Sequence, residues 1–234
     1  MSLTLSYQQR RAALEAYFDA TAIDAWAKLT SDAPVSRIRA TVRAGRDEMR
    51  GNLLSWLPED LRGCRLLDAG CGTGALAVEA ARRGADVVAI DIAPNLIAIA
   101  KERMPRDLGT GRIDFRAGDM LDPGLGQFDY VVSMDSLIHY QMEDVLRVLE
   151  GLAARTRTSI AFTFAPRTPA LAALHWAGQF FPRSDRSPAI VPFAPIKLME
   201  SIEAEQVLSG WRSARTQRVS RGFYISQALE ITRA

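Results

Sequence analysis

The strongest constraint on the fold is an alternation of short apolar segments with helical patterns that begins near residue 64. Strands are predicted at 65–68, 86–91, 112–117, 128–134 and 159–164. Helices are predicted at 74–83, 94–104, 141–153 and 196–208. Apolar, β-branched strands that alternate with helices indicate a parallel sheet covered on both faces. Two further strand patterns, at 211–219 and 223–232, follow each other closely and predict a terminal hairpin.

The remaining segments are expected to flank this α/β core. Residues 7–29 and 36–57 show the apolar spacing of amphipathic helices. Proline and aromatic residues interrupt the alternation after residue 165, which favours a cap over the carboxyl edge of the sheet. The expected division is a helical arm (1–58), a core (59–165 and 196–234) and an inserted cap (166–195).

Length and charge limit the broad class. A chain of 234 residues with a net charge of +2 suits one globular domain, and the balanced charge does not predict nucleic-acid binding. Cys64 and Cys71 bracket the first strand, roughly 20 Å apart at about 3.3 Å per residue, which is too far for a disulfide. With reduced thiols and no long apolar run, the expected location is cytoplasmic.

A glycine turn follows the first predicted strand, in the segment Asp68-Ala69-Gly70-Cys71-Gly72-Thr73-Gly74. Open α/β sheets bind ligands at this position, and the spacing also loosely matches the dinucleotide fingerprint. Asp68 discriminates between the two interpretations, because its carboxylate would repel a pyrophosphate. The ammonium and sulfonium of S-adenosylmethionine would instead be attracted. This methyl donor is therefore predicted, and a nicotinamide-dependent oxidoreductase is disfavoured.

Acidic residues also follow the second and third predicted strands. Asp91 is placed to accept hydrogen bonds from the ribose hydroxyls, and Asp119 from the adenine amino group, with Met120 over the ring. Either acid alone could equally be an ordinary loop residue; their order along the chain carries the prediction. The full predicted cofactor set is Asp68, Gly70, Cys71, Gly72, Gly74, Asp91, Ile92, Asp119, Met120 and Met134.

This ordered set resembles the class I S-adenosylmethionine-dependent methyltransferases. The resemblance implies a Rossmann-like, seven-stranded, mostly parallel sheet whose last strand is antiparallel. Two further segments, Met-Asp-Ser-Leu-Ile-His-Tyr at 134–140 and Phe-Ala-Pro-Arg-Thr at 164–168, resemble the magnesium-protoporphyrin IX O-methyltransferases of chlorophyll and bacteriochlorophyll synthesis. That family's activity is methyl transfer to one propionate of Mg-protoporphyrin IX, which gives the monomethyl ester and S-adenosylhomocysteine.

The family resemblance implies His139 as the catalytic residue. Its role stays open: it could orient the substrate, act as a base for residual carboxylic acid, or share with His175 the candidacy for an axial Mg ligand. A purely structural histidine is the fourth alternative. In oxygenic members of the family, a tyrosine of the helical arm is thought to assist catalysis. This chain has Thr30 at that position, so the catalytic role of the tyrosine is not assigned to it.

Candidate substrate residues combine aromatic walls for a flat macrocycle with arginines for its propionates. They are Tyr17, Thr30, Arg167, Trp176, Phe180, Arg183 and Arg186. No metal site of the protein's own is predicted. Alternatives to the porphyrin enzyme are a methyltransferase of another small aromatic compound, such as a quinone or phenol, and a catalytically silent porphyrin carrier. The resemblance also raises a handover from the magnesium chelatase and peripheral contact with the photosynthetic membrane.

Overall fold

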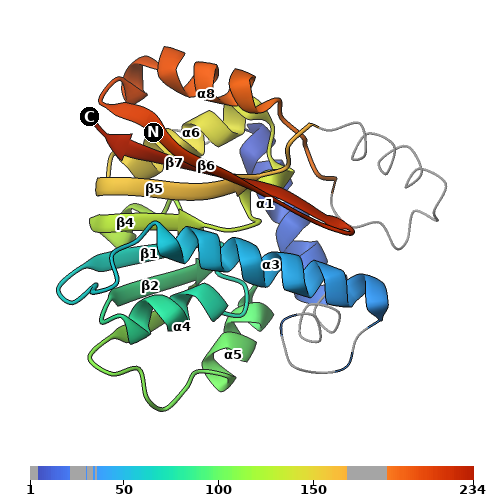
Figure 1. The fold of residues 1–234 in the computed structure, drawn as a ribbon, viewed down its shortest axis with the longest axis vertical. Coiled ribbons are helices and arrows are strands. Elements are labelled where there is room, and N and C mark those ends of the chain that lie inside the picture. The colour runs from blue at the N-terminus through green and yellow to red at the C-terminus, as the bar shows by residue number, and fades with distance from the viewer. Residues whose placement is uncertain (1–4, 22–29, 31–33, 35, 168–188) are drawn as a thin grey trace.

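The computed structural model describes all residues except 1–4, 22–29, 31–33, 35 and 168–188 (Figure 1). The strands are β1 (Arg65–Ala69), β2 (Asp86–Asp91), β3 (Arg112–Ala117), β4 (Phe128–Ser133), β5 (Thr156–Phe164), β6 (Trp211–Arg221) and β7 (Tyr224–Arg233). The α-helices are α1 (Leu5–Ala16), α3 (Arg37–Ser55), α4 (Ala75–Arg82), α5 (Pro94–Glu102), α6 (Met142–Ala153) and α8 (Pro195–Ala204). Short helices of other types are η1 (Tyr17–Thr21), η2 (Pro123–Leu125), η3 (Leu137–His139) and η5 (Gln206–Leu208). The alternation predicted from residue 64 onward is confirmed.

The strands form one seven-stranded sheet in the order β3-β2-β1-β4-β5-β7-β6. β1 to β5 pair in parallel, and β7 is antiparallel to both of its neighbours, β5 and β6. The predicted mostly parallel sheet with an antiparallel last strand is therefore confirmed. From β1 the chain adds strands outward to β3 and then returns to β4 on the other side. The gap between β1 and β4 is thus the switch point at which such sheets bind ligands.

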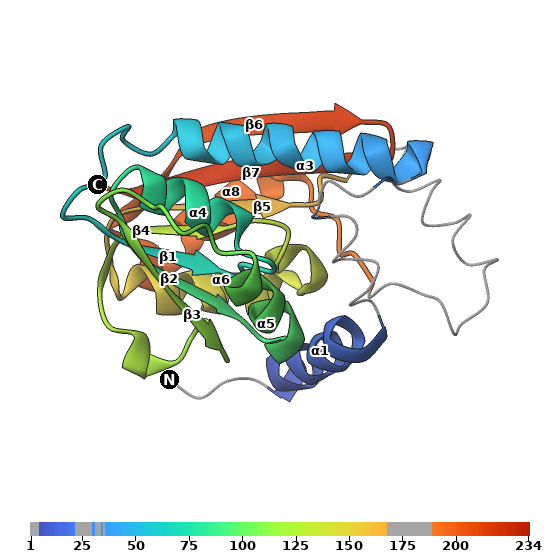
Figure 2. The ribbon, with the colours of Figure 1, turned by 90° about the horizontal axis from the view of Figure 1, so that it is seen from below.

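Helices cover both faces of the sheet, α3, α4 and α5 on one and α1, α6 and α8 on the other (Figures 1 and 2). Consecutive strand residues point to opposite faces. Leu66 accordingly packs with the first set of helices and Leu67 with the second, and Val87 and Val88 divide in the same way. Strands with two buried faces explain why their sequences read as continuous apolar runs.

The predicted boundary at residue 58 does not separate α3 from the core. Met49 and Leu53 of α3 are fully buried in the same apolar cluster as Leu66 of β1. Figure 2 shows α3 lying along β6, at the end of the sheet that holds the hairpin. The apolar face of α3 packs against the sheet, so the helix belongs to the core and not to a separate arm.

The first helix ends earlier than the sequence pattern predicts. A helix is expected over 7–29, but α1 ends at Ala16 and the chain continues as the π-helical turn η1; residues 22–29 lie outside the described residues. Asp19 in η1 accepts a hydrogen bond from the backbone N of Asn95 at 2.8 Å, at the start of α5. This hydrogen bond joins residues far apart in the chain and lies where the α-helix gives way to the π-helical turn. The apolar spacing of the sequence cannot predict such a contact.

The close approach of α3 to β7 requires glycine at position 45. A Cβ added to Gly45 would lie 2.5 Å from Cδ1 of Tyr224 and 2.8 Å from its Cβ. We therefore expect Gly45→Ala to lower the free energy of unfolding by about 1–3 kcal/mol, because overpacking outweighs the gain in helix propensity. Urea unfolding measures this change.

Gly51→Ala on the same helix is the matched control. A Cβ at Gly51 meets no atom within 4 Å. This variant should raise the free energy of unfolding by about 0.5–1 kcal/mol, the ordinary preference for alanine over glycine in a helix. If Gly45→Ala were stabilised to the same extent, the close contact with Tyr224 would be disproved.

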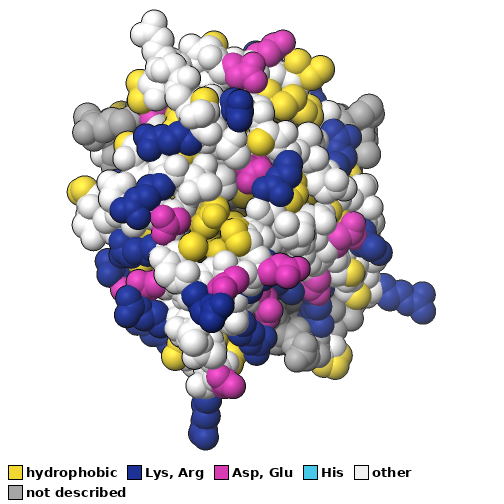
Figure 3. Space-filling view, turned by 60° about the vertical axis from the view of Figure 1, so that its left-hand side comes forward, with side chains coloured by type: hydrophobic (Ala, Val, Ile, Leu, Met, Phe, Trp, Pro, Cys, Tyr) yellow, Lys and Arg dark blue, Asp and Glu magenta, His cyan; other side chains and the backbone are white. Residues whose placement is uncertain are grey.

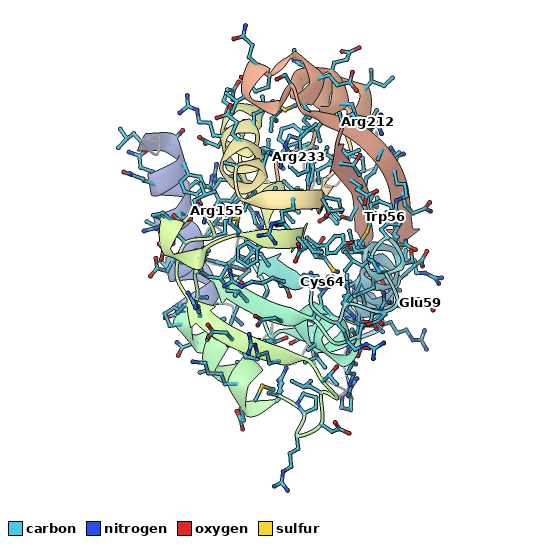
Figure 4. The ribbon with its side chains drawn as sticks, turned by 90° about the vertical axis from the view of Figure 1, so that its left-hand side faces the viewer. Trp56, Glu59, Cys64, Arg155, Arg212 and Arg233 are labelled. Carbon is cyan, nitrogen blue, oxygen red and sulfur yellow. The ribbon has the colours of Figure 1, made fainter. Side chains whose placement is uncertain are left out.

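The amino ends of the parallel strands form a charged edge. Figure 4 is viewed onto this edge, with Cys64 just before β1 and Arg155 just before β5.

Cys64 and Cys71 are both free thiols, as predicted. Figure 3 shows basic and acidic side chains interspersed on one face of the molecule. Arg112 of β3 forms an ion pair at 2.7 Å with Asp86 of the neighbouring strand β2.

Candidate active site

A cavity of about 310 Å³ opens at the carboxyl ends of the parallel strands. Its described lining comes from the ends of β1 and β2, the segments after β1 to β4, the elements α1, η1 and α3, and Thr30. These residues are Leu14, Phe18, Thr30, Arg43, Arg46, Asp47, Arg50, Asp68, Gly70, Cys71, Gly72, Thr73, Ala75, Leu76, Ile90, Asp91, Ile92, Leu96, Gly118, Met120, Met134, Asp135, Ser136, His139 and Tyr140. The cavity thus lies at the switch point, where the sequence places the methyl donor.

The glycine turn forms the floor of the cavity. The backbone N–H groups of Gly70 and Cys71 donate to the carbonyl of Ile90 at 2.8 and 3.0 Å, which ties the turn to β2. Gly70 has φ +81°, and an added Cβ would lie 2.4 Å from the Ser136 hydroxyl oxygen. Glycine is therefore needed at position 70, both for the left-handed backbone and for the close loop after β4.

Two glycine-turn predictions are refined by the structure. Gly74 does not belong to the described lining: a Cβ there would lie 2.6 Å from the Phe115 ring, so its role is packing at the start of α4. Cys71 does line the cavity, but burial together with the charges of Asp68 and Asp91 raises the pKa of its thiol well above the ordinary value. Cys71 is therefore an inert wall and not a nucleophile.

Asp68 presents a buried carboxylate to the cavity. The residue is 1% exposed, and Oδ2 has no hydrogen-bond partner among the residues the structure describes. Burial, and secondarily the charge of Asp91, raise the pKa of Asp68 to about 7. A buried carboxylate oxygen without a donor is costly, and an ammonium at this place would remove that cost. The residue thus fits the cation of the predicted methyl donor.

This pKa makes donor binding depend on pH. A cation binds the ionised form of Asp68. Below pH 7 the carboxyl group is mostly protonated because burial raises its pKa, so binding of the cation must release that proton. The Kd for S-adenosylmethionine should fall about tenfold per pH unit as pH rises toward 7, and then level off. Calorimetry between about pH 5 and about pH 8 measures this, with Asp68→Asn as the control that binds weakly at every pH. A wild-type Kd that does not change with pH would refute the assignment of Asp68.

Asp91 ends β2 beside the turn. Its carboxylate accepts hydrogen bonds from the backbone N of Gly72 at 2.8 Å and of Ala93 at 3.0 Å. Burial nevertheless raises its pKa, and the residue lines the cavity with its neighbour Ile92. The two backbone bonds fix the orientation of a carboxylate that can still accept from two adjacent hydroxyls, which suits the predicted ribose site.

Asp119 is placed differently from its prediction. The carboxylate accepts from the Tyr7 hydroxyl at 2.8 Å and from Arg11 at 3.0 Å, so α1 holds it outside the described lining of the cavity. Met120, in contrast, lines the cavity as predicted. Tyr7 also stacks on Tyr140, with ring centroids 5.2 Å apart. Asp119 therefore anchors α1 over this end of the cavity, a contact that local sequence cannot reveal.

His139 lies in η3 after β4 and lines the cavity, with the residue 5% exposed. Its Nδ1 is 3.3 Å from the carbonyl oxygen of Ala189. Because a carbonyl only accepts, Nδ1 carries the proton of this hydrogen bond, and Nε2 of the neutral ring is then an acceptor. The neutral side chain can thus take up a proton or bind a cation; donation from Nε2 requires the imidazolium.

The predicted substrate residues divide into three groups. Thr30 lines the cavity, and its hydroxyl accepts from Arg103 at 3.1 Å. Neither Tyr17 nor Arg167 belongs to the described lining: Tyr17 packs edge-on against Phe18, which does line it, and Arg167 is exposed. The other candidates, Trp176, Phe180, Arg183, Arg186 and the alternative Mg ligand His175, lie outside the described residues.

Sequence reasoning missed the wall that α3 contributes. Arg43, Arg46, Asp47 and Arg50 all line the cavity, whereas the sequence pattern predicts substrate-binding arginines in the cap. Their spacing of three, four and seven residues places them on one face of a helix. This spacing is readable in the sequence; its significance depends on α3 packing against the sheet.

Family models match two overlapping parts of the chain. Residues 66–159 match a methyltransferase domain, which covers the glycine turn and the segments after β1 to β4. Residues 133–233 match the description "Magnesium-protoporphyrin IX methyltransferase C-terminus", which begins at the end of β4 and includes His139. Both models therefore cover the loop after β4 that lines the cavity.

Whole-chain relatives agree with these models. A magnesium-protoporphyrin O-methyltransferase of Rhodobacter capsulatus is 55% identical over 96% of this chain and 97% of its own length. One from Synechocystis sp. is 29% identical over 93% of this chain and 94% of its own. The solved structure of a Synechocystis magnesium protoporphyrin IX methyltransferase with bound SAH matches with a TM-score of 0.83 at 28% identity, covering 96% of this chain and all of the other. The chain belongs to the magnesium-protoporphyrin O-methyltransferase family.

Proposed function

We propose that the chain transfers a methyl group from S-adenosylmethionine to a propionate carboxylate of Mg-protoporphyrin IX, giving the monomethyl ester. The observation that carries the proposal is the buried carboxylate oxygen of Asp68 beside the glycine turn, which has no hydrogen-bond partner in the described part of the chain. It fits a cationic donor and disfavours a phosphate-bearing cofactor. The names of relatives that match nearly the whole chain support the porphyrin as the acceptor.

The chemistry requires alignment more than proton transfer. S-adenosylmethionine supplies a methyl carbon on a sulfonium: an oxygen–carbon bond forms, the carbon–sulfur bond breaks, and its electron pair stays on sulfur. A propionate has a reference pKa of about 4.3, so the nucleophile is already ionised at neutral pH. Holding the two reactants in line can supply about 7–11 kcal/mol at the upper limit of measured effects. The protein supplies this alignment through the cavity walls.

His139 is the proposed catalytic side chain of the acceptor half. With Nδ1 donating to Ala189, the neutral ring offers Nε2 as an acceptor. Nε2 suits removal of the proton from a propionate that keeps its proton inside the cavity, where burial raises the pKa of a carboxyl group. Two other roles are possible for His139: the imidazolium could orient the carboxylate, or the ring could bind the porphyrin magnesium as an axial ligand. The variants His139→Ala and His139→Gln distinguish these roles.

The test is product formation from two matched acceptors. Protein, S-adenosylmethionine and either Mg-protoporphyrin IX or metal-free protoporphyrin are incubated, and esters are detected by mass spectrometry. We expect the monomethyl ester from the magnesium porphyrin at a much higher rate. Binding of the porphyrin without any ester would indicate the carrier alternative and overturn the proposal.

A phenol or quinone acceptor is the second candidate from the sequence. A phenol has a pKa of about 10 and benefits from a base, so its turnover at saturating donor should fall steeply below about pH 7. Turnover with a carboxylate acceptor should change much less over this range. A steep fall would favour the second candidate.

Partners and location remain predictions. Among the described residues, no helix has the length and hydropathy needed to cross a bilayer. The porphyrin is the proposed small-molecule partner. Handover from the magnesium chelatase and peripheral contact with a photosynthetic membrane are proposals that rest on the resemblance alone. The cytoplasmic location is a proposal that rests on the reduced thiols of Cys64 and Cys71.

A further inference from the structure

Two large apolar side chains are exposed at the end of the molecule where the cavity opens. Ile38, in the first turn of α3, is 54% exposed, and Phe223, in the loop between β6 and β7, is 52% exposed. Figure 1 shows the start of α3 and the end of the β6–β7 hairpin on the side of the sheet where β5 finishes. Neither residue belongs to the described lining of the cavity, so the methyl donor gives no reason for them.

Ile38 continues the buried face of α3 beyond the sheet. Val42, Met49 and Leu53 belong to the apolar cluster that joins α3 to the strands. Ile38 lies four residues before Val42 and therefore on the same face of the helix. Met49 and Leu53 are fully buried, whereas Ile38 is largely exposed. The apolar face of α3 is thus one turn longer than the packing of the core requires.

Phe223 occupies a position where hairpins usually have a small polar residue. Arg221 pairs with Tyr224 at the end of the hairpin, so the loop between them has two residues. Gly222 supplies the positive φ (+56°) that the first position of such a loop requires. The second position is commonly asparagine, aspartate or serine. The turn itself therefore does not explain an exposed phenylalanine.

The loop lies against the same part of α3. A Cβ added to Gly222 would lie 2.7 Å from the hydroxyl oxygen of Thr41. Thr41 in turn donates from its hydroxyl to the carbonyl oxygen of Ile38 at 2.8 Å. Phe223 thus follows a residue that contacts the turn of helix carrying Ile38. We call Ile38 and Phe223 the apolar rim.

The apolar rim adjoins the cavity and is held in place. Tyr224, directly after Phe223, donates from its hydroxyl to Asp135 at 3.0 Å, and Asp135 lines the cavity. On the other side of the loop, Arg221 forms an ion pair with Glu48 of α3. Because both ends of the loop are fixed, little conformational entropy is lost when a ligand contacts it.

The cavity has room for one ligand of the donor's size. Its volume of about 310 Å³ is at the lower end of the roughly 300–1,000 Å³ of small-molecule sites. Asp68 and Asp91 favour the donor as that ligand. The proposed acceptor is a flat apolar tetrapyrrole ring that carries each reacting carboxylate on two methylene groups. Such a short arm brings a carboxylate to the donor only if the ring itself lies at the mouth of the cavity.

We propose that the apolar rim, Ile38 and Phe223, binds the tetrapyrrole ring of the acceptor while one propionate reaches into the cavity. This assignment rests on the proposed function, since it requires a porphyrin acceptor. An aromatic side chain suits a planar macrocycle, because aromatic rings attract each other in stacked or edge-on arrangements. The rim selects for a large apolar ring and contributes nothing to donor binding.

The test measures acceptor and donor affinity in the same variants. Fluorescence titration gives the Kd of Mg-protoporphyrin IX, and calorimetry gives that of S-adenosylmethionine. Phe223→Ser and Ile38→Ser should each weaken porphyrin binding about 3- to 15-fold, because about half of each side chain is left for the ring to bury. The Kd for the donor should stay at the wild-type value in both variants.

Two further variants are controls. Phe223→Tyr keeps the aromatic ring and should retain the wild-type Kd for the porphyrin. Val207→Ser removes an apolar side chain that is 65% exposed in η5, near the start of β6 and thus at the opposite end of that strand from the loop. It should change neither Kd. In turnover, Phe223→Ser should raise the KM for Mg-protoporphyrin IX with little change in kcat.

The outcomes separate this inference from the proposed function. If wild type forms no ester from Mg-protoporphyrin IX, the proposed function fails. If it forms the ester and both serine variants keep the wild-type Kd for the porphyrin, only the rim assignment is overturned. Equal losses of donor and porphyrin affinity would show a disturbed cavity and would also overturn it.

Other occupants of the apolar rim have their own signatures. Cosedimentation with phosphatidylglycerol vesicles tests a lipid surface, and sedimentation velocity tests a second copy of the chain. If Phe223→Ser lowered vesicle binding or self-association and left the porphyrin Kd unchanged, the rim would belong to that occupant and the inference would be wrong.

Discussion

Asp91→Ala should reduce the affinity for S-adenosylmethionine about 10²- to 10⁴-fold. The carboxylate is placed to accept from two ribose hydroxyls, and each such charge-assisted hydrogen bond contributes about 1.5–3 kcal/mol, with about 1.4 kcal/mol per tenfold in Kd. Part of the loss will come from the turn, because Asp91 also accepts from Gly72. Isothermal titration calorimetry on the folded variant measures the change.

Asp114→Ala provides the control for Asp91→Ala. Asp114 is also a strand aspartate, on β3, but it is exposed and pairs with Arg116 at 2.7 Å outside the described lining of the cavity. Its replacement should leave the Kd for the donor unchanged. Wild-type affinity in Asp91→Ala, with a native circular dichroism spectrum, would refute the donor site at the end of β2.

His139→Ala should lower turnover about 10²- to 10⁴-fold and leave the affinity for S-adenosylmethionine near the wild-type value. The imidazole lies beyond β4, in the part of the cavity near Phe18, with ring centroids 5.9 Å apart. The carboxylates proposed to bind the donor, Asp68 and Asp91, belong to β1 and β2 and do not depend on this ring. Single-turnover methylation at saturating donor isolates the chemical step; unchanged turnover would remove His139 from the mechanism.

His139→Gln distinguishes between the roles of the side chain. Glutamine can donate and accept hydrogen bonds but takes up no proton at neutral pH. Activity that glutamine restores identifies orientation, whereas activity lost in both variants identifies proton transfer. Axial ligation has its own signature, because the optical spectrum of bound Mg-porphyrin would change in His139→Ala; an unaltered spectrum eliminates that role.

Most of the fold could be predicted because its determinants are local. β2 is Asp86–Asp91 and β3 is Arg112–Ala117, with the bounds that the apolar runs indicate. The sequence pattern does not predict how an element is placed when the placement depends on packing against distant residues. Met49 and Leu53 indicate a helix with an apolar face but not the sheet that covers it. The placement of α3 therefore required the structure.

The candidate site divides in the same way. The glycine turn and Asp91 are short-range signals at the ends of strands, and the structure brings them together. Asp119 looks equivalent in sequence but is engaged by Arg11, 108 residues away along the chain. The pairing of Arg46 with Asp135 spans 89 residues. Such contacts between distant segments leave no local pattern, and so the α3 wall was missed.

The insertion of β7 between β5 and β6 sets an order in which a growing chain can complete this enzyme. β6 leaves the ribosome before β7, yet its only strand partner in the described sheet is β7, so it must wait for the final segment before it can pair. The part of the cavity that carries Asp68 and Asp91 is built from β1 and β2 and does not require the pairing of β6 with β7. Tyr224 and Ser226, which hydrogen-bond to Asp135 on the opposite side of the cavity, are translated later. A nascent chain can therefore form the glycine turn and the end of β2 well before Asp135 gains these two hydroxyl partners.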